Sequence, residues 1–173
     1  LDLFFWMQAL IGALVFLILT FTLVGRVIGV VGGSMLSTLH EGDLLLLQSV
    51  GYTPKQGDVV VLRKSSFMTE PIVKRVIAVA GQHVQVDYAT GQVYVDGEAL
   101  DEPYINEVMV DPLDPLETVL DVTVPEGSIY VMGDNRNHSS DSRDERLGTV
   151  DTRYVLGRAL WILTPFDHFG AIE

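Results

Sequence analysis

The chain opens with one long apolar segment. Residues 3–25 contain no Asp, Glu, Lys or Arg. As an α-helix this segment would be roughly 34 Å long, enough to cross a hydrocarbon core of about 30 Å. Aromatic residues at 4–6 lie near one end, where they favour the membrane interface. A cleavable signal peptide has a shorter apolar region and a small-residue cleavage site, which residues 25–27 match poorly. We therefore predict a transmembrane anchor over 1–26, with a buried core helix as the alternative.

The charges beside this segment leave its orientation open. Arg26 follows the span and Asp2 precedes it, which by the positive-inside rule favours a cytoplasmic C-terminal side. The chain starts at Leu1 and not at methionine, so we expect residues upstream that hold the deciding charges.

The rest of the chain carries short β-branched runs and runs that alternate with period two, which predict strands. Residues 83–87 and 92–96 alternate around a turn at 89–91, the pattern of a β-hairpin, and Asp96-Gly97 marks the next turn. We predict a mainly β protein: an antiparallel β-sheet domain with further strands in 59–62, 72–79, 129–132, 154–156 and 159–162.

Charge divides this β domain. Residues 76–135 contain no Lys or Arg, whereas Asp and Glu recur, and residues 111–115 are rich in turn formers. We predict a small acidic β lobe at 82–128, inserted between the two halves of the main domain at 27–81 and 129–173. Its acidity is interpreted as a solvated surface.

Composition excludes several classes of function. The 173 residues allow one domain with a smaller lobe, and a net charge of −12 opposes nucleic-acid binding. The chain has no cysteine, which excludes disulfides, thiol nucleophiles and thiolate metal sites. No Gly-rich nucleotide loop is evident, so we expect no cofactor.

The four histidines show no metal-ligand spacing. We interpret them as surface or structural residues and predict no metal site; they are His40, His83, His138 and His168.

Two positions carry candidate chemistry. Gly32 and Gly33 precede Ser34, and paired glycines let backbone N–H groups approach a reacting carbonyl. Lys74 lies in a β-branched run, and burial would lower the pKa of its amine until it could take a proton from a serine hydroxyl. Taken singly, each has a plainer explanation: a flexible turn for the glycines and a solvated surface lysine for Lys74.

The segment 132–143 packs acid, amide, guanidinium and hydroxyl groups into one loop. This density is typical of a hydrogen-bonded network that orients catalytic groups, although a solvated loop is the commoner case.

In this order the segments resemble the bacterial type I signal peptidases (leader peptidases) over nearly the whole chain. The apolar segment comes first, followed by matching motifs that read GSM-x-x-TL-x-x-GD (33–43), GDVVV (57–61), VKRVI (73–77), YVDG (94–97), DEPY (101–104), MGDNR-x-x-S-x-DSR (132–143) and Gly148. Any one piece would be weak, whereas the ordered set is specific.

The resemblance implies a serine endopeptidase that cuts signal peptides from exported preproteins at the outer face of the membrane. Ser34 would be the nucleophile, with its backbone N–H in the oxyanion hole, and Lys74 would be the neutral general base. Ser139 would orient the lysine, Asp141 and Arg143 would form a salt bridge behind it, and Asp134 and Arg136 would belong to the same supporting network. By position, the small residues before the cut would enter pockets lined by Val30, Met35, Leu39, Ile72 and Val73.

The chain departs from the family pattern at two positions. Ser37 stands where the family usually has proline, which should loosen the turn after the nucleophile. Gly32 stands where some members have a serine that helps to bind the oxyanion. The endoplasmic-reticulum relatives have histidine in place of Lys74, so the bacterial branch fits better.

The expected partners are preprotein signal peptides and the lipid bilayer, and the oligomeric state stays open. The resemblance places the catalytic domain outside the cytoplasm, and we expect Trp161, Phe166 and Phe169 to rest on the membrane. Two alternatives remain: a self-cleaving serine/lysine protease, and an inactive relative that acts as a membrane-tethered binding module.

Overall fold

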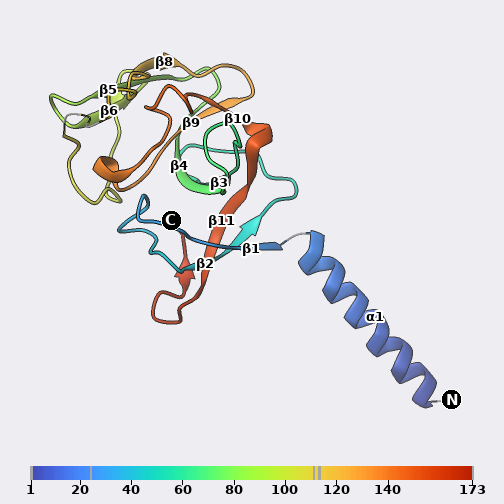
Figure 1. Ribbon diagram of the computed structural model, residues 1–173. Helices are drawn as coiled ribbons and strands as arrows, with labels where there is room; N and C mark the ends of the chain where they lie inside the picture. The colour runs from blue at the N-terminus through green and yellow to red at the C-terminus, as the bar shows by residue number, and fades with distance from the viewer. Residues whose placement is uncertain (1, 24, 111, 113, 173) are drawn as a thin grey trace.

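A computed structural model describes residues 2–23, 25–110, 112 and 114–172. One helix, α1 (Asp2–Leu23), extends away from two β-sheets (Figure 1). The predicted helical segment is two residues too long, because Gly25 and Arg26 belong to β1 (Gly25–Gly29). They pair with Gln48 and Leu47, so their backbone groups are bonded within the sheet.

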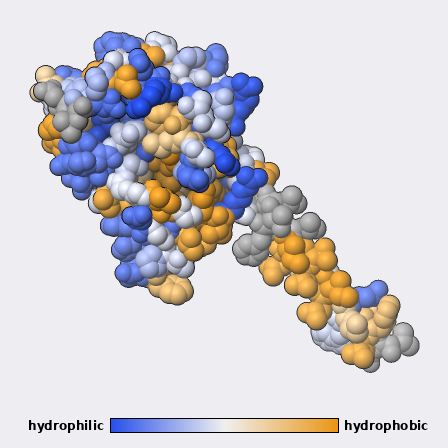
Figure 2. All heavy atoms as spheres, viewed as in Figure 1, coloured by the Kyte–Doolittle hydropathy of each residue, from blue (hydrophilic) through white to orange (hydrophobic). Residues whose placement is uncertain are grey.

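The apolar side chains of α1 that the structure describes, within residues 3–18, are exposed, and Figure 2 shows them as a hydrophobic rod. Within the described part of the chain, no helix combines the length and the apolar character that crossing a membrane requires. The anchor over 1–26 stays a prediction.

The main sheet is antiparallel and joins the two ends of the sequence. Its strand order is β1-β2-β11-β3-β4-β9-β10, and β12 pairs with β11. The bounds are β2 (Leu44–Gln48), β3 (Val59–Leu62), β4 (Ile72–Val79), β9 (Ser128–Met132), β10 (Val150–Asp151), β11 (Val155–Thr164) and β12 (Gly170–Ala171), with 3-10 turns η1 (Arg136–His138) and η2 (Thr152–Tyr154). Because β4 lies beside β9, the segments that carry Lys74 and the 132–143 loop become neighbours.

A second, four-stranded sheet has the order β7-β6-β5-β8, with bounds β5 (His83–Asp87), β6 (Gln92–Val95), β7 (Glu98–Ala99) and β8 (Asp121–Thr123). The predicted hairpin is confirmed, with Val84 opposite Val95. Asp96 and Gly97 form the next turn at positive φ, the geometry of a two-residue hairpin loop. All four strands fall inside the segment 82–128 that the sequence indicated as a separate lobe.

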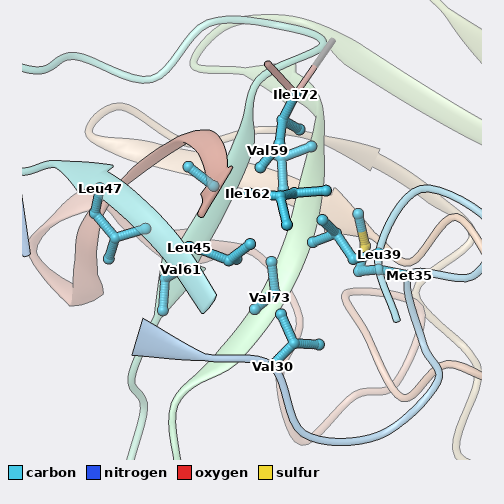
Figure 3. Close-up of a cluster of buried hydrophobic side chains, with 11 residues drawn as sticks. Val30, Met35, Leu39, Leu45, Leu47, Val59, Val61, Val73, Ile162 and Ile172 are labelled. Atoms are coloured by element: carbon cyan, nitrogen blue, oxygen red, sulfur yellow. The ribbon is translucent and has the colours of Figure 1, made fainter. Parts of the chain in front are cut away.

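Two hydrophobic clusters matter for the site. One joins the second sheet to β4 and β9 through residues such as Val84, Val93, Ile77 and Tyr130. The other lies beneath the segment that follows β1 and is drawn in Figure 3: Val30, Met35, Leu39, Leu45, Leu47, Val59, Val61, Val73, Ala159, Ile162 and Ile172. Burying these side chains fixes the segment that carries Ser34 against the sheet.

The strands predicted at 59–62, 72–79 and 129–132 are confirmed. The runs predicted at 154–156 and 159–162 form one strand, β11, except that Tyr154 belongs to the preceding turn η2. The register of β11 shifts twice along β2. β1 and β2 were not predicted, because four consecutive leucines in β2 show no alternation and β1 continues an apolar run.

Candidate active site

Ser34 and Lys74 meet beside β4, an interior strand of the main sheet. Lys74 is on β4, with only 2% of its surface exposed, and partly exposed Ser34 is in the turn that follows β1. The Lys74 Nζ donates a hydrogen bond of 2.6 Å to the Ser34 Oγ. The sheet therefore brings together two residues that are 40 positions apart in the sequence.

The pKa of Lys74 is lowered from 10.5 to about 8, mainly because the amine is buried. The Asp141 and Asp134 carboxylates oppose this shift in the pKa, whereas the Arg143 guanidinium adds to it. About a tenth of the amine is therefore neutral at pH 7 and about half at pH 8, and a neutral amine can accept the hydroxyl proton of Ser34.

The backbone around Ser34 is held by Asn135, a residue for which the sequence analysis assigned no role. The Asn135 Nδ2 donates to the Gly33 carbonyl at 2.9 Å, and its backbone N–H donates to the Ser34 carbonyl at 3.1 Å. Met35 and Leu39 anchor the other side of the turn in the core. The position of the Ser34 side chain is thus fixed from two directions. Its place inside the 132–143 motif was the feature of the sequence that could have identified Asn135 as a site residue.

Only glycine fits at position 133, because the neighbouring atoms leave no room for a side chain. A Cβ atom at this position would overlap the Ser139 side chain and the carbonyl oxygen of Ser34. The absence of a side chain at Gly133 lets β9 approach the Ser34 turn closely, which brings Asn135 within hydrogen-bonding distance.

Asp141 is the centre of a buried network behind Lys74. It accepts hydrogen bonds from the Ser139 hydroxyl at 2.7 Å and the Gly133 N–H at 3.0 Å. Arg143 pairs with it in a bidentate geometry, at 2.8 and 2.9 Å. Burial alone would raise the pKa of Asp141, but Arg143 outweighs it and holds the pKa below its ordinary value. The salt bridge expected between Asp141 and Arg143 is present.

Asp134 and Arg136 belong to two further buried ion pairs. Asp134 binds Arg75 of β4 at 2.8 and 2.9 Å and accepts a 2.6 Å bond from the Thr38 hydroxyl. Arg136 binds Glu102 at 2.6 and 2.9 Å, and its Nε donates to the Gly133 carbonyl. The polar residues of the 132–143 loop are therefore mostly buried and paired, and the loop is not a solvated one.

A cleft of about 240 Å³ opens beside Ser34 and Lys74. Four of the five residues predicted as pocket lining border it: Val30, Met35, Ile72 and Val73. Leu39 does not line this cleft, because its side chain is fully buried in the core beneath.

Met68, His138 and Ser140 also line the cleft and were not predicted. A larger cavity of about 470 Å³ is bordered by Arg136, Ser139 and Arg143, but not by Ser34 or Lys74.

A serine hydroxyl bonded to a desolvated lysine, beside an apolar cleft, can perform nucleophilic attack on a carbonyl carbon. This is the arrangement of an acyl-transferring hydrolase. Comparison with known proteins agrees: the family model "Signal peptidase, peptidase S26" matches residues 3–164.

Two curated relatives are similar over most of their length. A probable signal peptidase I-1 of Synechocystis sp. is 36% identical over 149 residues, which cover 80% of this chain and 71% of the relative. A signal peptidase I of Bacillus licheniformis is 35% identical over 174 residues, covering 96% of this chain and 91% of the relative. A solved structure of a signal peptidase I from Enterococcus faecalis V583 is 28% identical and covers 65% of this chain and 98% of its own, with a TM-score of 0.47.

The chain belongs to the signal peptidase family, peptidase S26, and within it to the bacterial type I signal peptidases. Its class of activity is that of a serine endopeptidase, a hydrolase of peptide bonds.

Proposed function

We propose that the protein removes N-terminal signal peptides from exported preproteins, cutting after small residues of the Ala-x-Ala type, with Ser34 as nucleophile and Lys74 as general base. The observation that carries this proposal is the 2.6 Å hydrogen bond between the Lys74 Nζ and the Ser34 Oγ, at the edge of an apolar cleft.

In the proposed reaction the neutral Lys74 amine takes the proton of the Ser34 hydroxyl while the Oγ attacks the scissile carbonyl carbon. The resulting ammonium then protonates the leaving amine as the C–N bond breaks, which leaves an acyl ester on Ser34. Lys74, neutral again, takes a proton from the water that hydrolyses this ester and restores the hydroxyl.

The backbone N–H of Ser34 would stabilise the negative oxygen of the tetrahedral intermediate. Asn135 supports this role, because it bonds the Gly33 carbonyl, which belongs to the same peptide unit as this N–H, and the Ser34 carbonyl of the next unit, and so orients both. Gly32 has no side-chain hydroxyl, so any second donor is a backbone group or water.

Ser139, Asp141 and Arg143 would position Lys74. The Asp141 carboxylate is held by Arg143 and the Ser139 hydroxyl, and it raises the pKa of Lys74 against the effect of burial. Asp134 and Arg136 would hold the loop that carries these groups, through their own buried partners.

The substrate would bind as an added strand in the cleft, with small side chains before the cut entering it. Val30, Met35, Ile72 and Val73 support this placement, because they give the cleft an apolar wall of limited volume. A larger side chain before the cut would need space that these residues occupy.

The proposed location is the bacterial cytoplasmic membrane, with one span formed by α1 and the catalytic domain on the extracytoplasmic side. The exposed apolar surface of α1 supports this, because such a surface favours contact with lipid. Arg26 then follows the span on the outer side, against a simple count of positive charges.

Incubation of the detergent-solubilised protein with a preprotein that carries an Ala-x-Ala site tests this function. We expect cleavage at that site by the parent protein and none by Ser34→Ala or Lys74→Ala. Ser66→Ala and Lys64→Ala are matched controls, because Ser66 is exposed and Lys64 binds the Arg146 and Leu147 carbonyls. Cleavage that survives Lys74→Ala would refute the dyad. A parent protein that cleaves nothing would favour an inactive binding relative, and cleavage confined to the protein itself would favour a self-cleaving protease.

A further inference from the structure

Three side chains with metal-binding atoms meet away from Ser34 and Lys74. His40 and Asp43 lie just before β2, and His168 lies in the connection between β11 and β12. One ligand atom from each lies within 4.8 Å of the other two. The spacing of histidines in the sequence gave no sign of this group, because 125 residues separate Asp43 from His168.

The distances suit a small transition-metal ion. A tetrahedral zinc ion with ligands at about 2.0–2.1 Å places neighbouring ligand atoms about 3.4 Å apart. The Asp43 Oδ1 and His168 Nδ1 are already 3.4 Å apart, a long distance for a hydrogen bond. The rings of His40 and His168 have centroids 4.5 Å apart, and because His40 is exposed its ring is free to turn towards an ion held by the other two.

The carboxylate is fixed before any ion binds. Asp43 is 1% exposed, and its Oδ2 accepts a 2.8 Å hydrogen bond from the backbone N–H of His40. The other oxygen, Oδ1, faces His168. Among the residues that the structure describes, Asp43 forms an ion pair with His168 and none with a lysine or arginine. A cation bound between this carboxylate and the two imidazoles would compensate the charge of a buried acid.

We propose that His40, Asp43 and His168 form a site for a divalent transition-metal ion such as Zn²⁺. Two imidazole nitrogens and one carboxylate oxygen suit zinc and its neighbours in the first transition row, whereas Mg²⁺ and Ca²⁺ prefer oxygen ligands. Water completes the coordination sphere.

The ion would join the connection between β11 and β12, which carries His168, to the segment after Ser34, which carries His40 and Asp43. The Asp43 carbonyl accepts a hydrogen bond from the N–H of Val30, a residue of the cleft wall, and the Leu39 N–H bonds to the Met35 carbonyl just before His40. Metal binding therefore stabilises the folded chain by holding two distant segments together, and it takes no part in the chemistry at Ser34.

Titration of Zn²⁺ into the full chain in detergent, after treatment with a chelator and its removal, tests the site. We expect one equivalent to bind and to raise the unfolding temperature, while Mg²⁺ has no effect. His40→Gln and His168→Gln should each weaken zinc binding at least tenfold. His83→Gln is the matched control, because His83 also pairs with an aspartate, Asp121, at 2.6 Å on an exposed surface. Its zinc affinity should equal that of the parent.

Co²⁺ gives an independent readout, because its visible spectrum reports bound imidazole and a low coordination number. The parent and His83→Gln should show this spectrum, and the His40 and His168 variants should lose it while keeping the far-ultraviolet circular dichroism of the parent. The proposal is overturned if the parent binds no stoichiometric zinc, if binding survives either His40→Gln or His168→Gln, or if His83→Gln removes it.

Discussion

A single buried lysine sets the working range of the proposed reaction. Lys74 is 2% exposed, and burial lowers its pKa to about 8. A general base is most effective when its pKa lies near the working pH, because it is then both unprotonated and a sufficiently strong base. Asp141 prevents the pKa from falling further, and a lower value would weaken the base.

The rate of cleavage should therefore depend on pH through Lys74. Below a pKa of about 8 the amine is protonated, so kcat/KM should fall about tenfold for each further pH unit. The measurement is kcat/KM for a fluorogenic signal-peptide substrate from pH 6 to 10, with circular dichroism at each pH to confirm that the protein is folded. A rate that is level from pH 9 down to pH 6 would contradict a lysine base.

The same residue should cost stability. Because the folded state lowers the pKa of Lys74 from 10.5 to about 8, the unfolded chain binds one more proton between these values. Stability then rises with pH across this window, and below it the penalty is about 3 kcal/mol. Lys74→Met should raise the unfolding temperature at pH 7, and its advantage should shrink as the pH rises from 8 to 10.5.

Calorimetry of Lys74→Met and Lys64→Met at several pH values measures this effect, with Lys64→Met as the reference for deleting a lysine that binds a carbonyl at the protein surface. If Lys74→Met gains stability by the same amount at every pH, the gain comes from better side-chain packing and not from removal of the buried charge.

At the scale of elements, buried ion pairs hold the loop 132–143 to the strands around it. Asp134 links the end of β9 to Arg75 of β4 and to Thr38 in the turn after the nucleophile. Arg75 also bonds the Gly57 carbonyl and lies 3.9 Å from the centre of the Tyr104 ring. One aspartate therefore connects three segments, and its loss removes a counter-charge from the buried Arg75 guanidinium.

Asp134→Asn should lower the free energy of unfolding by about 3 kcal/mol, the usual cost of breaking a buried pair from one side. Asp151→Asn is the control, because its partner Arg153 is 88% exposed and exposed ion pairs contribute little to stability. Urea denaturation of both variants measures the difference. Equal losses would mean that the Asp134 pair is no stronger than a surface one.

The strands also show which elements a sequence pattern alone can predict. The hairpin at 83–96 has alternating residues on both sides of a turn that contains Gly91, so the local sequence pattern predicted it correctly. β2 could not be found in this way, because its leucines give no period, and only pairing with β1 and β11 makes it a strand.

The candidate site divides in the same manner. Ser34, Lys74 and the 132–143 loop carry recognisable motifs, so the sequence singled them out. The partners of that loop lie far away along the chain, such as Glu102 with Arg136 and Arg75 with Asp134, and only the folded sheet brings them together. Leu39 was misplaced for a related reason: its position near Ser34 in the sequence does not reveal which face of the turn it occupies.

At the scale of the whole molecule, apolar surface continues beyond α1. Trp161 and Phe169 lie side by side, with ring centroids 5.5 Å apart, and Phe166 is 86% exposed in the β11–β12 connection. β11 is joined through β2 to β1, the strand that follows α1 (Figure 1). A second contact with lipid through these aromatic residues would hold the cleft near the membrane, where a preprotein leaves it.

A variant that lacks residues 1–23 tests this contact, because it removes α1 and keeps β1, which begins at Gly25. It should still bind phosphatidylglycerol–phosphatidylcholine vesicles, and replacing Trp161, Phe166 and Phe169 by serine should weaken that binding at least fivefold, since the buried aromatic area supplies the affinity. Val108→Ser/Val110→Ser is the control, because it removes apolar side chains that are 64% and 56% exposed outside this patch. Vesicle flotation measures the bound fraction, and near-ultraviolet circular dichroism confirms folding. Unchanged binding after the aromatic replacements would leave α1 as the membrane contact and remove the patch from the proposal.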